Sequence, residues 1–229
     1  MMISLTASET VADGTKQFHF TKPEGFQYRA GQSVDLTLQS GLMHAYSLAS
    51  APHNSELCIA TRMRGSAFKK ELDALEPGDG VQIDGPFGSF FLHENAARPA
   101  VFLAGGIGVT PFYSMVQDAA HRKLPHKIVM LFSNKRPEDA PFLENLTQLA
   151  AEYTNFTFVP TMDALATSKE VWLGEAGRID QAMVKKYLPE GQPIFYTAGP
   201  PGMVTAMRTL LNSMGVSDDD IRFEEFSGY

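Results

Sequence analysis

The chain of 229 residues has a single cysteine and no long apolar run. The lone cysteine, Cys58, excludes an intramolecular disulfide framework and an iron–sulfur cluster held by cysteines. No stretch approaches the ~18 consecutive apolar residues of a membrane-spanning helix. The N-terminus also lacks the basic start and the apolar core of a secretion signal. We therefore expect a cytoplasmic protein without a membrane span.

Positive charge is scarce as well. The chain carries 19 Lys and Arg against 26 Asp and Glu, a net charge of −7. This balance argues against non-specific binding of nucleic acid, which requires a basic surface. Hydrophobic residues make up 44% of the chain and charged residues 20%, which is typical of a folded protein. The length predicts one or two domains.

The first half of the chain alternates short β-like runs with Gly- and Pro-rich turns. Runs at residues 33–38, 45–49, 57–62 and 81–84 have this character. Strands at such spacing predict an antiparallel β-barrel or sandwich. One helix is expected over residues 67–75, because Ser66 can cap it and Phe68, Leu72 and Leu75 share a face.

Beyond residue 96 the pattern changes to strands that alternate with helices. Apolar strands are predicted at 100–104, 128–132, 156–160 and 194–198, helices at 111–121, 140–153, 179–187 and 202–214, and a final run at 221–226. Continuous apolar strands between helices indicate a parallel sheet that is covered on both faces. We therefore predict two domains, an antiparallel β-barrel or sandwich at 1–96 and an α/β domain with a parallel sheet at 97–229, joined by a linker at 92–99.

Two glycine-rich turns follow predicted strands of the second half. In the first, Gly105, Gly106 and Gly108 precede Thr110 and Pro111 at the start of a helix. Backbone amides in such a turn can approach an anion, which the start of the helix then stabilises. The second turn runs from Gly199 through Pro200 to Met203. Both turns are expected at the carboxyl edge of the sheet, where ligands bind, although each alone is also compatible with an ordinary strand–helix connection.

A third motif lies in the barrel half, where His44, Ala45, Tyr46 and Ser47 follow one another. Residues alternate between the two faces of a strand, so His44 and Tyr46 share one side and Ala45 and Ser47 the other. A tyrosine can stack on a flat ring and a serine can form hydrogen bonds with it. Taken alone, the motif indicates an ordinary half-buried strand.

Together these motifs resemble the ferredoxin–NADP reductase superfamily. The resemblance covers the whole chain and rests on ordered motifs: Phe26 with Ala30-Gly31-Gln32, His44 to Ser47, Arg64 to Phe68, Asp84 to Gly88, Ala104 to Pro111, Ala198 to Met203 and Glu224-Glu225-Phe226. The resemblance implies an FAD-binding barrel followed by an α/β domain that binds a nicotinamide dinucleotide. No metal site is predicted.

The resemblance assigns FAD to the barrel half. It implies that Tyr46 packs against the flavin ring and that Ser47 forms a hydrogen bond near flavin N5. The family has an arginine at the FAD pyrophosphate where this chain has His44, and histidine is mostly neutral at pH 7. Arg62 or Arg64 can replace that arginine, or His44 can become charged beside the phosphates. The remaining implied contacts to FAD are Ala45, Ile59, Ala60, Thr61, Gly65, Ser66 and Ala67.

The resemblance assigns NAD(P)H to the second half. The implied contacts to the phosphates and the nicotinamide are Gly105, Gly106, Gly108, Thr110, Gly199, Pro200 and Met203. Ser133, Asn134, Lys135 and Arg136 are expected around the adenosine ribose. Lys135 and Arg136 can clamp a 2′-phosphate and favour NADPH, or they can belong to a solvated loop with Glu138 and Asp139. Ala198 stands where many family members have a cysteine beside the nicotinamide.

The chain ends on aromatic residues that bear on access to the flavin. In part of the family a terminal aromatic side chain covers the flavin, and Phe226 is the first candidate here and Tyr229 the second. Relatives with an appended ferredoxin module continue with a four-cysteine loop. The cysteine content therefore leads us to expect a stand-alone reductase with a separate acceptor.

The predicted activity is that of an FAD-dependent NAD(P)H oxidoreductase. Hydride passes from NAD(P)H to FAD, and electrons then pass to an acceptor such as a ferredoxin or an oxygenase component. Tyr46, Ser47 and Phe226 are the predicted catalytic residues, and a basic face with Arg64, Lys69 and Lys70 is a candidate docking surface. The alternatives are a free-flavin or ferric reductase, an electron-transfer subunit without independent turnover, and a dinucleotide sensor.

Overall fold

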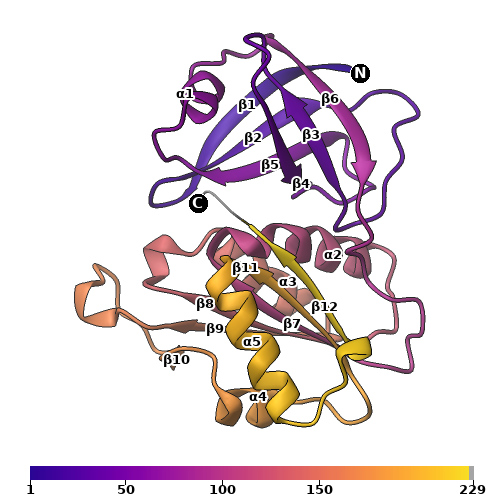
Figure 1. Cartoon of the computed structure of the whole chain (residues 1–229), viewed down its shortest axis with the longest axis vertical. Helices are drawn as coiled ribbons and strands as arrows, with labels where there is room; N and C mark the ends of the chain where they lie inside the picture. The colour runs from indigo at the N-terminus through magenta and orange to yellow at the C-terminus, as the bar shows by residue number, and fades with distance from the viewer. Residues whose placement is uncertain (227–229) are drawn as a thin grey trace.

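The computed structural model describes residues 1–226 and places the strands in two six-stranded sheets, one above the other in Figure 1. The first sheet has the order β4-β3-β6-β1-β2-β5, and its strands are β1 (Met2–Ala12), β2 (Thr15–Thr21), β3 (Ser33–Thr37), β4 (Met43–Ser47), β5 (Glu56–Arg62) and β6 (Gly80–Phe87). The second has the order β10-β9-β8-β7-β11-β12, and its strands are β7 (Ala100–Gly105), β8 (Ile128–Asn134), β9 (Phe156–Met162), β10 (Glu175–Ala176), β11 (Ile194–Gly199) and β12 (Ile221–Glu225).

The helices of the chain are α1 (Ala67–Asp73), α2 (Thr110–His121), α3 (Leu143–Glu152), α4 (Gln181–Tyr187) and α5 (Pro201–Ser213). Short 3₁₀ turns are η1 (Gly106–Val109), η2 (Pro137–Asp139), η3 (Leu165–Thr167) and η4 (Asp218–Asp220). Paired strands are antiparallel throughout the first sheet and parallel throughout the second. The predicted order of architectures, an antiparallel barrel followed by a parallel α/β sheet, is confirmed.

The first sheet curls around an apolar core of its own. On β3, Val34 and Leu36 are buried in that core while the residues between them stay partly exposed. Helix α1 starts after Ser66, whose hydroxyl accepts a hydrogen bond from the Lys69 amide at 3.3 Å, as predicted for a helix cap. The prediction missed β1 and β2. The second half of β1 is exposed and polar, so it lacks the alternation that marks a half-buried strand.

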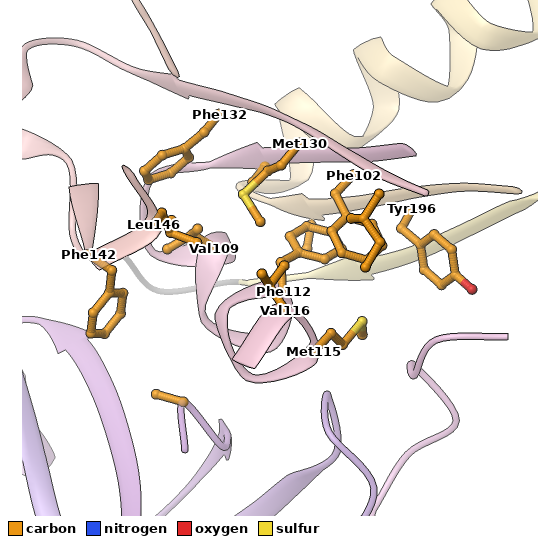
Figure 2. Packing of buried hydrophobic residues seen from close by; sticks show 14 of the residues in the cluster. Phe102, Val109, Phe112, Met115, Val116, Met130, Phe132, Phe142, Leu146 and Tyr196 are labelled. Carbon is orange, nitrogen blue, oxygen red and sulfur yellow. The ribbon is translucent and has the colours of Figure 1, made fainter. Parts of the chain in front are cut away.

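The second sheet is buried on both faces. Alternate residues of β7 go to opposite sides, with Phe102 in the core under α2 and α3 and Leu103 in the core that Met207 and Leu211 of α5 also line. Figure 2 shows Phe102 beside Phe112 of α2, and their rings stack at 4.5 Å. Burial on both faces explains why these strands read as continuous apolar runs.

The two halves also share a core. Ala49, Ala60 and Phe90 from the first half belong to the same buried cluster as Phe102 and Phe112. Helix α2 adds polar contacts to the first half. The Ser114 hydroxyl donates to the carbonyl oxygen of Ser50 at 2.5 Å, and the Gln117 amide donates to that of Ala49 at 3.0 Å. These contacts hold α2 against the barrel.

The predicted linker is tied to the second half by specific side chains. The Tyr196 hydroxyl lies 2.9 Å from both the backbone amide and Nδ1 of His93, and Arg98 forms an ion pair with Asp220 at 2.8 Å. Segment 92–99 therefore connects the two sheets and is held in place by contacts of His93 and Arg98. The domain boundary at residues 96 and 97 falls within this connecting segment and stays a prediction. Within residues 1–226, no helix combines the length and apolarity needed to cross a bilayer.

Candidate functional site

The carboxyl ends of β7, β8, β11 and β12 meet at the edge of the second sheet that faces the barrel. Figure 1 shows β12 running up to this edge, where its end lies below the first sheet. Turns at the carboxyl edge of an open parallel sheet are the usual place for ligands. Two cavities open here, one against β4 and one above the glycine-rich turns.

The first cavity has a volume of 150 Å³ and lies between β4 and the end of β12. Its walls are Ser33, His44, Ala45, Tyr46, Ser47, Glu224, Glu225 and Phe226. The Ser47 hydroxyl donates a hydrogen bond to Glu224 Oε2 at 3.3 Å. The backbone amide of Phe226 donates to the carbonyl oxygen of Gly199 at 3.0 Å, which prolongs the pairing of β12 with β11. The three predicted catalytic residues therefore line one cavity.

Tyr46 lines this cavity and is almost completely buried. Its ring stacks with that of His44 at 4.8 Å and tilts against Phe68 at 5.8 Å. The hydroxyl makes no hydrogen bond of ordinary geometry with residues 1–226, and burial raises the pKa of Tyr46 to about 12 against a smaller lowering effect of Thr61. Tyr46 therefore remains a neutral phenol at physiological pH, and the part of it that a ligand can use is mainly the aromatic ring.

Two ionisable side chains of the first cavity, Glu224 and Glu225, are not among the predicted site residues, and Glu224 is the one that contacts Ser47. Burial raises its pKa to about 7, and the hydrogen bond from Ser47 acts in the opposite direction. The carboxyl group is therefore divided between its protonated and ionised forms near neutral pH. Within the Glu224-Glu225-Phe226 motif, the resemblance assigns a role only to Phe226. The sequence carries no signal that links Glu224 to Ser47, 177 positions away.

The second cavity has a volume of 190 Å³ and is built from both halves of the chain. Its walls are Arg62, Arg64, Gly105, Gly106, Ile107, Ser133, Asn134, Lys135, Asp163, Pro200 and Met203. Asp163 pairs with Arg178 at 3.0 Å, whereas Arg62, Arg64 and Lys135 form no ion pair with any of residues 1–226. The cavity therefore has an excess of positive charge, which suits an anionic ligand.

Asn134 contributes an unsatisfied polar group to the second cavity. The residue is 7% exposed, and neither its side-chain oxygen nor its nitrogen has a hydrogen-bond partner among the described residues. An amide left in this state costs free energy unless a ligand or water satisfies it. This fits a site that binds a polar molecule.

The two glycine-rich turns pack directly against each other. A Cβ atom on Gly108 would lie 2.4 Å from the carbonyl oxygen of Ala198 and 2.5 Å from the Cα of Gly199. A Cβ on Gly105 would lie 2.1 Å from the Met203 sulfur. At Gly106, in contrast, φ is +53° and the space above it is open. Gly106 therefore offers its backbone to a ligand, whereas Gly108 is needed for the contact between the turns.

Several predicted site residues lie outside both cavities. Ile59, Ala60 and Thr61 are buried in β5, and Gly65, Ser66 and Ala67 are exposed at the start of α1. Thr110 is buried, and its hydroxyl donates to the Ile107 carbonyl oxygen at 2.7 Å. Gly199 is a neighbour of the first turn and lines neither cavity. Tyr229 lies outside the described residues.

Arg136 is the predicted 2′-phosphate ligand that the structure turns away from the cavity. Its guanidinium holds both carboxylate oxygens of Asp139, at 2.7 and 2.8 Å, and lies 3.5 Å from Glu138. These partners raise the pKa of Arg136 and lower that of Asp139. Arg136 therefore matches the second of the two alternatives, a loop in which it pairs with Glu138 and Asp139. Lys135, in contrast, lines the second cavity.

One of the three residues of the predicted basic docking face, Lys69, is buried. Lys69 is 3% exposed, and burial lowers its pKa. Arg64 and Lys70 remain at the surface. The prediction was wrong for Lys69 because a position on the inner face of the short helix α1 buries even a long charged side chain.

Comparison with known proteins adds two family matches. Residues 2–92 match an oxidoreductase FAD-binding domain, and residues 102–209 match an oxidoreductase NAD-binding domain. The reductase component of propane 2-monooxygenase from Rhodococcus jostii is 26% identical over 219 residues, which are 90% of this chain and 57% of that protein. One polypeptide of the Na⁺-translocating NADH-quinone reductase of Actinobacillus pleuropneumoniae is 31% identical over 204 residues, 82% of this chain and 49% of that protein. The chain thus spans about half the length of these relatives.

Solved structures share the fold. The flavohem-like FAD/NAD-binding domain of nitric oxide dioxygenase from Vibrio cholerae has a TM-score of 0.86 and 21% identity, with 98% of each chain covered. A ferredoxin NADP⁺ reductase from Neisseria gonorrhoeae, determined with bound FAD and NADP, has a TM-score of 0.83 and 21% identity, again with 98% of each chain covered. At this level of identity the similarity establishes the common arrangement of two sheets.

Proposed function

The chain belongs to the ferredoxin–NADP reductase superfamily of FAD- and NAD-binding oxidoreductases, and we propose that it carries electrons from NADPH through FAD to a separate protein acceptor. The observation that carries this proposal is the pair of cavities at one edge of the domain junction. One is lined by Tyr46, Ser47 and Glu224, and the other by cationic side chains and a glycine turn. Bound FAD would supply the hydride acceptor and the means to release electrons one or two at a time.

The residues of β4 and α1 fit an FAD molecule by their chemistry. The Tyr46 ring offers an apolar face, Ser47 a hydroxyl group, and Gly65 to Ala67 exposed backbone amides at the start of α1. The cavity of 150 Å³ is smaller than the ~300–1,000 Å³ typical of ligand pockets. A flavin ring therefore requires His44 or Phe226 to swing aside, which gives Phe226 the role of a cover.

The second cavity fits a dinucleotide with three phosphate groups. Gly106 provides open backbone at the turn, and Asn134 an amide whose polar atoms have no partner among residues 1–226. Arg62, Arg64 and Lys135 supply three cations for the pyrophosphate and a 2′-phosphate. This excess of positive charge supports NADPH over NADH, even though Arg136 is held by Asp139.

Ser47 and Glu224 would act on protons beside the flavin. The Ser47 hydroxyl donates to Glu224 Oε2, so the pair can hold a proton between the two oxygen atoms. Because the pKa of Glu224 is raised to about 7, the carboxyl group exchanges that proton near neutral pH. The hydride transfer itself needs no acid or base from the protein. Ser47 and Glu224 would instead orient the flavin ring and balance its charge.

The nature of the relatives supports a protein acceptor. The matched proteins include reductase components of a propane 2-monooxygenase and of a terephthalate 1,2-dioxygenase, the latter from Comamonas sp and 27% identical over 203 residues. We propose an oxygenase component or a ferredoxin as the acceptor of this chain.

The test uses the purified full chain loaded with FAD. We expect a yellow protein whose flavin absorbance is bleached faster by NADPH than by NADH, with turnover when ferricyanide is the acceptor. A panel of ferredoxins and oxygenase components should then show saturable reduction of at least one protein. A colourless chain that retains no FAD on gel filtration, but reduces free flavin, would establish the alternative of a free-flavin reductase. Bleaching without turnover would indicate a non-autonomous electron-transfer component.

A further inference from the structure

The connecting segment, residues 92–99, is fastened to the second sheet by the side chain of His93. His93 is 6% exposed and lies beside Tyr196 of β11, which is 0% exposed. The Tyr196 hydroxyl lies 2.9 Å from the backbone amide of His93 and 2.9 Å from its Nδ1. Figure 2 shows this hydroxyl directed away from the rings of Phe102 and Phe112. The contact between His93 and Tyr196 is therefore a polar one at the border of an apolar cluster.

The hydrogen bonds around His93 determine where its proton lies. Nε2 lies 2.9 Å from the carbonyl oxygen of Arg98, which can only accept, so Nε2 carries the proton. Nδ1 is therefore an acceptor and receives the hydrogen of the Tyr196 hydroxyl. The oxygen of that hydroxyl accepts from the His93 amide, and it has no further hydrogen-bond partner among residues 1–226. Every donor and acceptor of this contact is satisfied while the imidazole is neutral.

A second proton on His93 would break the contact. A hydrogen on Nδ1 would point at the Tyr196 oxygen, which already accepts from the backbone amide. The hydroxyl hydrogen would then lose its acceptor, and Tyr196 is too deeply buried for water to replace it. A buried donor without a partner costs free energy, so the charged ring favours release of the connecting segment from β11.

The charged groups around His93 also oppose a second proton. Burial lowers the pKa of His93, and His126, Arg222 and Arg98 act in the same direction, whereas the hydrogen bond to the Arg98 carbonyl oxygen raises it. The His126 ring stands edge-on at 5.1 Å, and Arg222 of β12 lies over the Tyr196 ring at 5.4 Å. The carboxylates of this region are each paired with an arginine: Asp220 with Arg98 at 2.8 Å, Asp118 with Arg122 at 3.1 Å and Glu94 with Arg29 at 3.6 Å.

The His93–Tyr196 contact bears on the candidate site because β11 ends there. Beyond Tyr196 the strand runs to Gly199, whose carbonyl oxygen accepts from the Phe226 amide at 3.0 Å, and the turn that follows lines the second cavity. On its other side the connecting segment follows Phe90, which is buried in the core that both halves share. His93 thus fastens the end of the barrel half to the strand that borders both cavities.

We propose that His93 is a positioning residue whose neutral ring holds the connecting segment on Tyr196, and that protonation of Nδ1 in mild acid releases it. The contact keeps the barrel at the edge where both cavities lie, so its release disturbs the alignment of the flavin site with the dinucleotide site. The effect on hydride transfer rests on the proposed function, whereas the contact itself is a property of the fold.

The first test follows the ring of His93 by ¹⁵N NMR in the full chain with FAD, over a pH range around the ordinary histidine value of ~6.5. In Tyr196→Phe the titration midpoint of His93 should rise by about one pH unit, because the neutral ring loses the hydrogen bond that it accepts. Tyr187→Phe is the control, since its hydroxyl donates to Glu175 instead. A midpoint that stays in place in Tyr196→Phe would overturn the proposal.

A measurement on the unaltered protein guards against misfolding of the variant. The His93 amide donates to the Tyr196 hydroxyl, so its protection from hydrogen exchange should fall about tenfold as His93 titrates. The amide of Leu131, in the centre of β8, should keep its protection over the same range. If the His93 amide remained protected through the titration, the charged ring would not release the segment.

The kinetic test measures how fast NADPH bleaches bound FAD as a function of pH. In the wild type the rate constant should fall about tenfold in acid, with the midpoint of His93. His93→Asn offers an acceptor oxygen to Tyr196 but takes up no proton, so it should keep the rate at pH 8 and lose this acid fall. An acid fall that persists in His93→Asn would remove the positioning role. If NADPH bleached no FAD, the proposed function would fail, and the NMR and exchange measurements would still decide the release of the segment.

Discussion

At the scale of single residues, Glu224 shows how the surroundings change a side chain's chemistry. A glutamate is ordinarily ionised at pH 7, but partial burial of this carboxyl group between β4 and β12 raises its pKa to about 7. The adjacent Glu225 is exposed. Two identical neighbours in the sequence therefore have different roles, because only one of them faces Ser47.

Glu224→Gln tests this shift through protein stability. Between the usual value of 4.5 and about 7, the native state keeps a proton on Glu224 that the unfolded chain releases. The contribution of Glu224 to the free energy of unfolding should therefore decrease as pH rises from 5 to 7, by at most about 3 kcal/mol, and level off above 7. Urea unfolding of both proteins measures the difference.

The control for this measurement is Glu225→Gln. Its free energy of unfolding should follow that of the wild type across the same pH range. If the difference between the wild type and Glu224→Gln were constant with pH, the carboxyl group would be ordinary and its role in proton exchange would have to be abandoned.

His44 is a residue whose identity departs from the family pattern. It stands where the resemblance implies a permanently charged arginine, and its ring stacks with that of Tyr46 at 4.8 Å. A histidine offers a pyrophosphate a full charge only when it is protonated. This position on β4 leads to a prediction about the pH dependence of FAD binding.

We expect the dissociation constant of FAD to rise between pH 6 and pH 8 in the wild type. In His44→Arg it should be about tenfold lower at pH 8 and independent of pH, because arginine keeps its charge. Fluorescence titration of the apoprotein gives both curves, and His53→Arg, at an exposed position, serves as the control. A flat wild-type curve would assign the pyrophosphate to Arg62 or Arg64 instead.

At the scale of elements, the turn after β7 and the turn after β11 form one unit. Their strands are neighbours in the sheet, and the backbone at Ala198 and Gly199 fills the space where a side chain on Gly108 would lie. The family resemblance implies that the glycines of both turns contact the nicotinamide dinucleotide. The structure separates Gly106, which faces open space, from Gly108, which permits the turns to touch.

Gly108→Ala should destabilise the protein by about 2–3 kcal/mol, because backbone atoms at 2.4–2.5 Å from the new Cβ cannot be displaced without moving a strand. Gly202→Ala provides the matched control. Gly202 lies in α5 with nothing near its Cβ position, so alanine should be neutral or slightly stabilising there. The measurement is the thermal unfolding midpoint of each variant. Equal midpoints for Gly108→Ala and Gly202→Ala would contradict the packing argument.

At the scale of the whole molecule, the second cavity exists only because the two halves are docked. Arg62 and Arg64 come from the end of β5 and the loop that follows, and Lys135 follows β8 in the other half. The docking is maintained by the shared core and by the contacts of α2 with Ala49 and Ser50. A dinucleotide in this cavity would therefore meet cations from both halves.

Lys135→Ala should raise the KM for NADPH about tenfold and change that for NADH little, because one charge-assisted contact to the 2′-phosphate is lost. Lys127→Ala is the control, since Lys127 is exposed at the opposite end of the same strand, β8. Steady-state kinetics with ferricyanide measure both constants. An equal rise for the two coenzymes would place Lys135 at the pyrophosphate.

Much of the fold could be predicted because it is encoded locally. The continuous apolar runs of β7, β8 and β11 and the cap at Ser66 depend on neighbours within a few positions. Contacts between distant segments could not be predicted in this way. The burial of Lys69, the pairing of Arg136 with Asp139 and the hydrogen bond from Ser47 to Glu224 depend on how elements pack.

The sequence by itself determined the order of the two architectures, the positions of the glycine-rich turns and the motifs that resemble FAD- and NAD-binding domains. These features follow from residue periodicity and from turn chemistry, which act over short stretches of chain. Only the tertiary structure decided that Glu224 lies beside Ser47 and that Gly108 is a packing residue. Each of these depends on the distance between segments that are remote in the chain, and that distance is set by the docking of one half on the other.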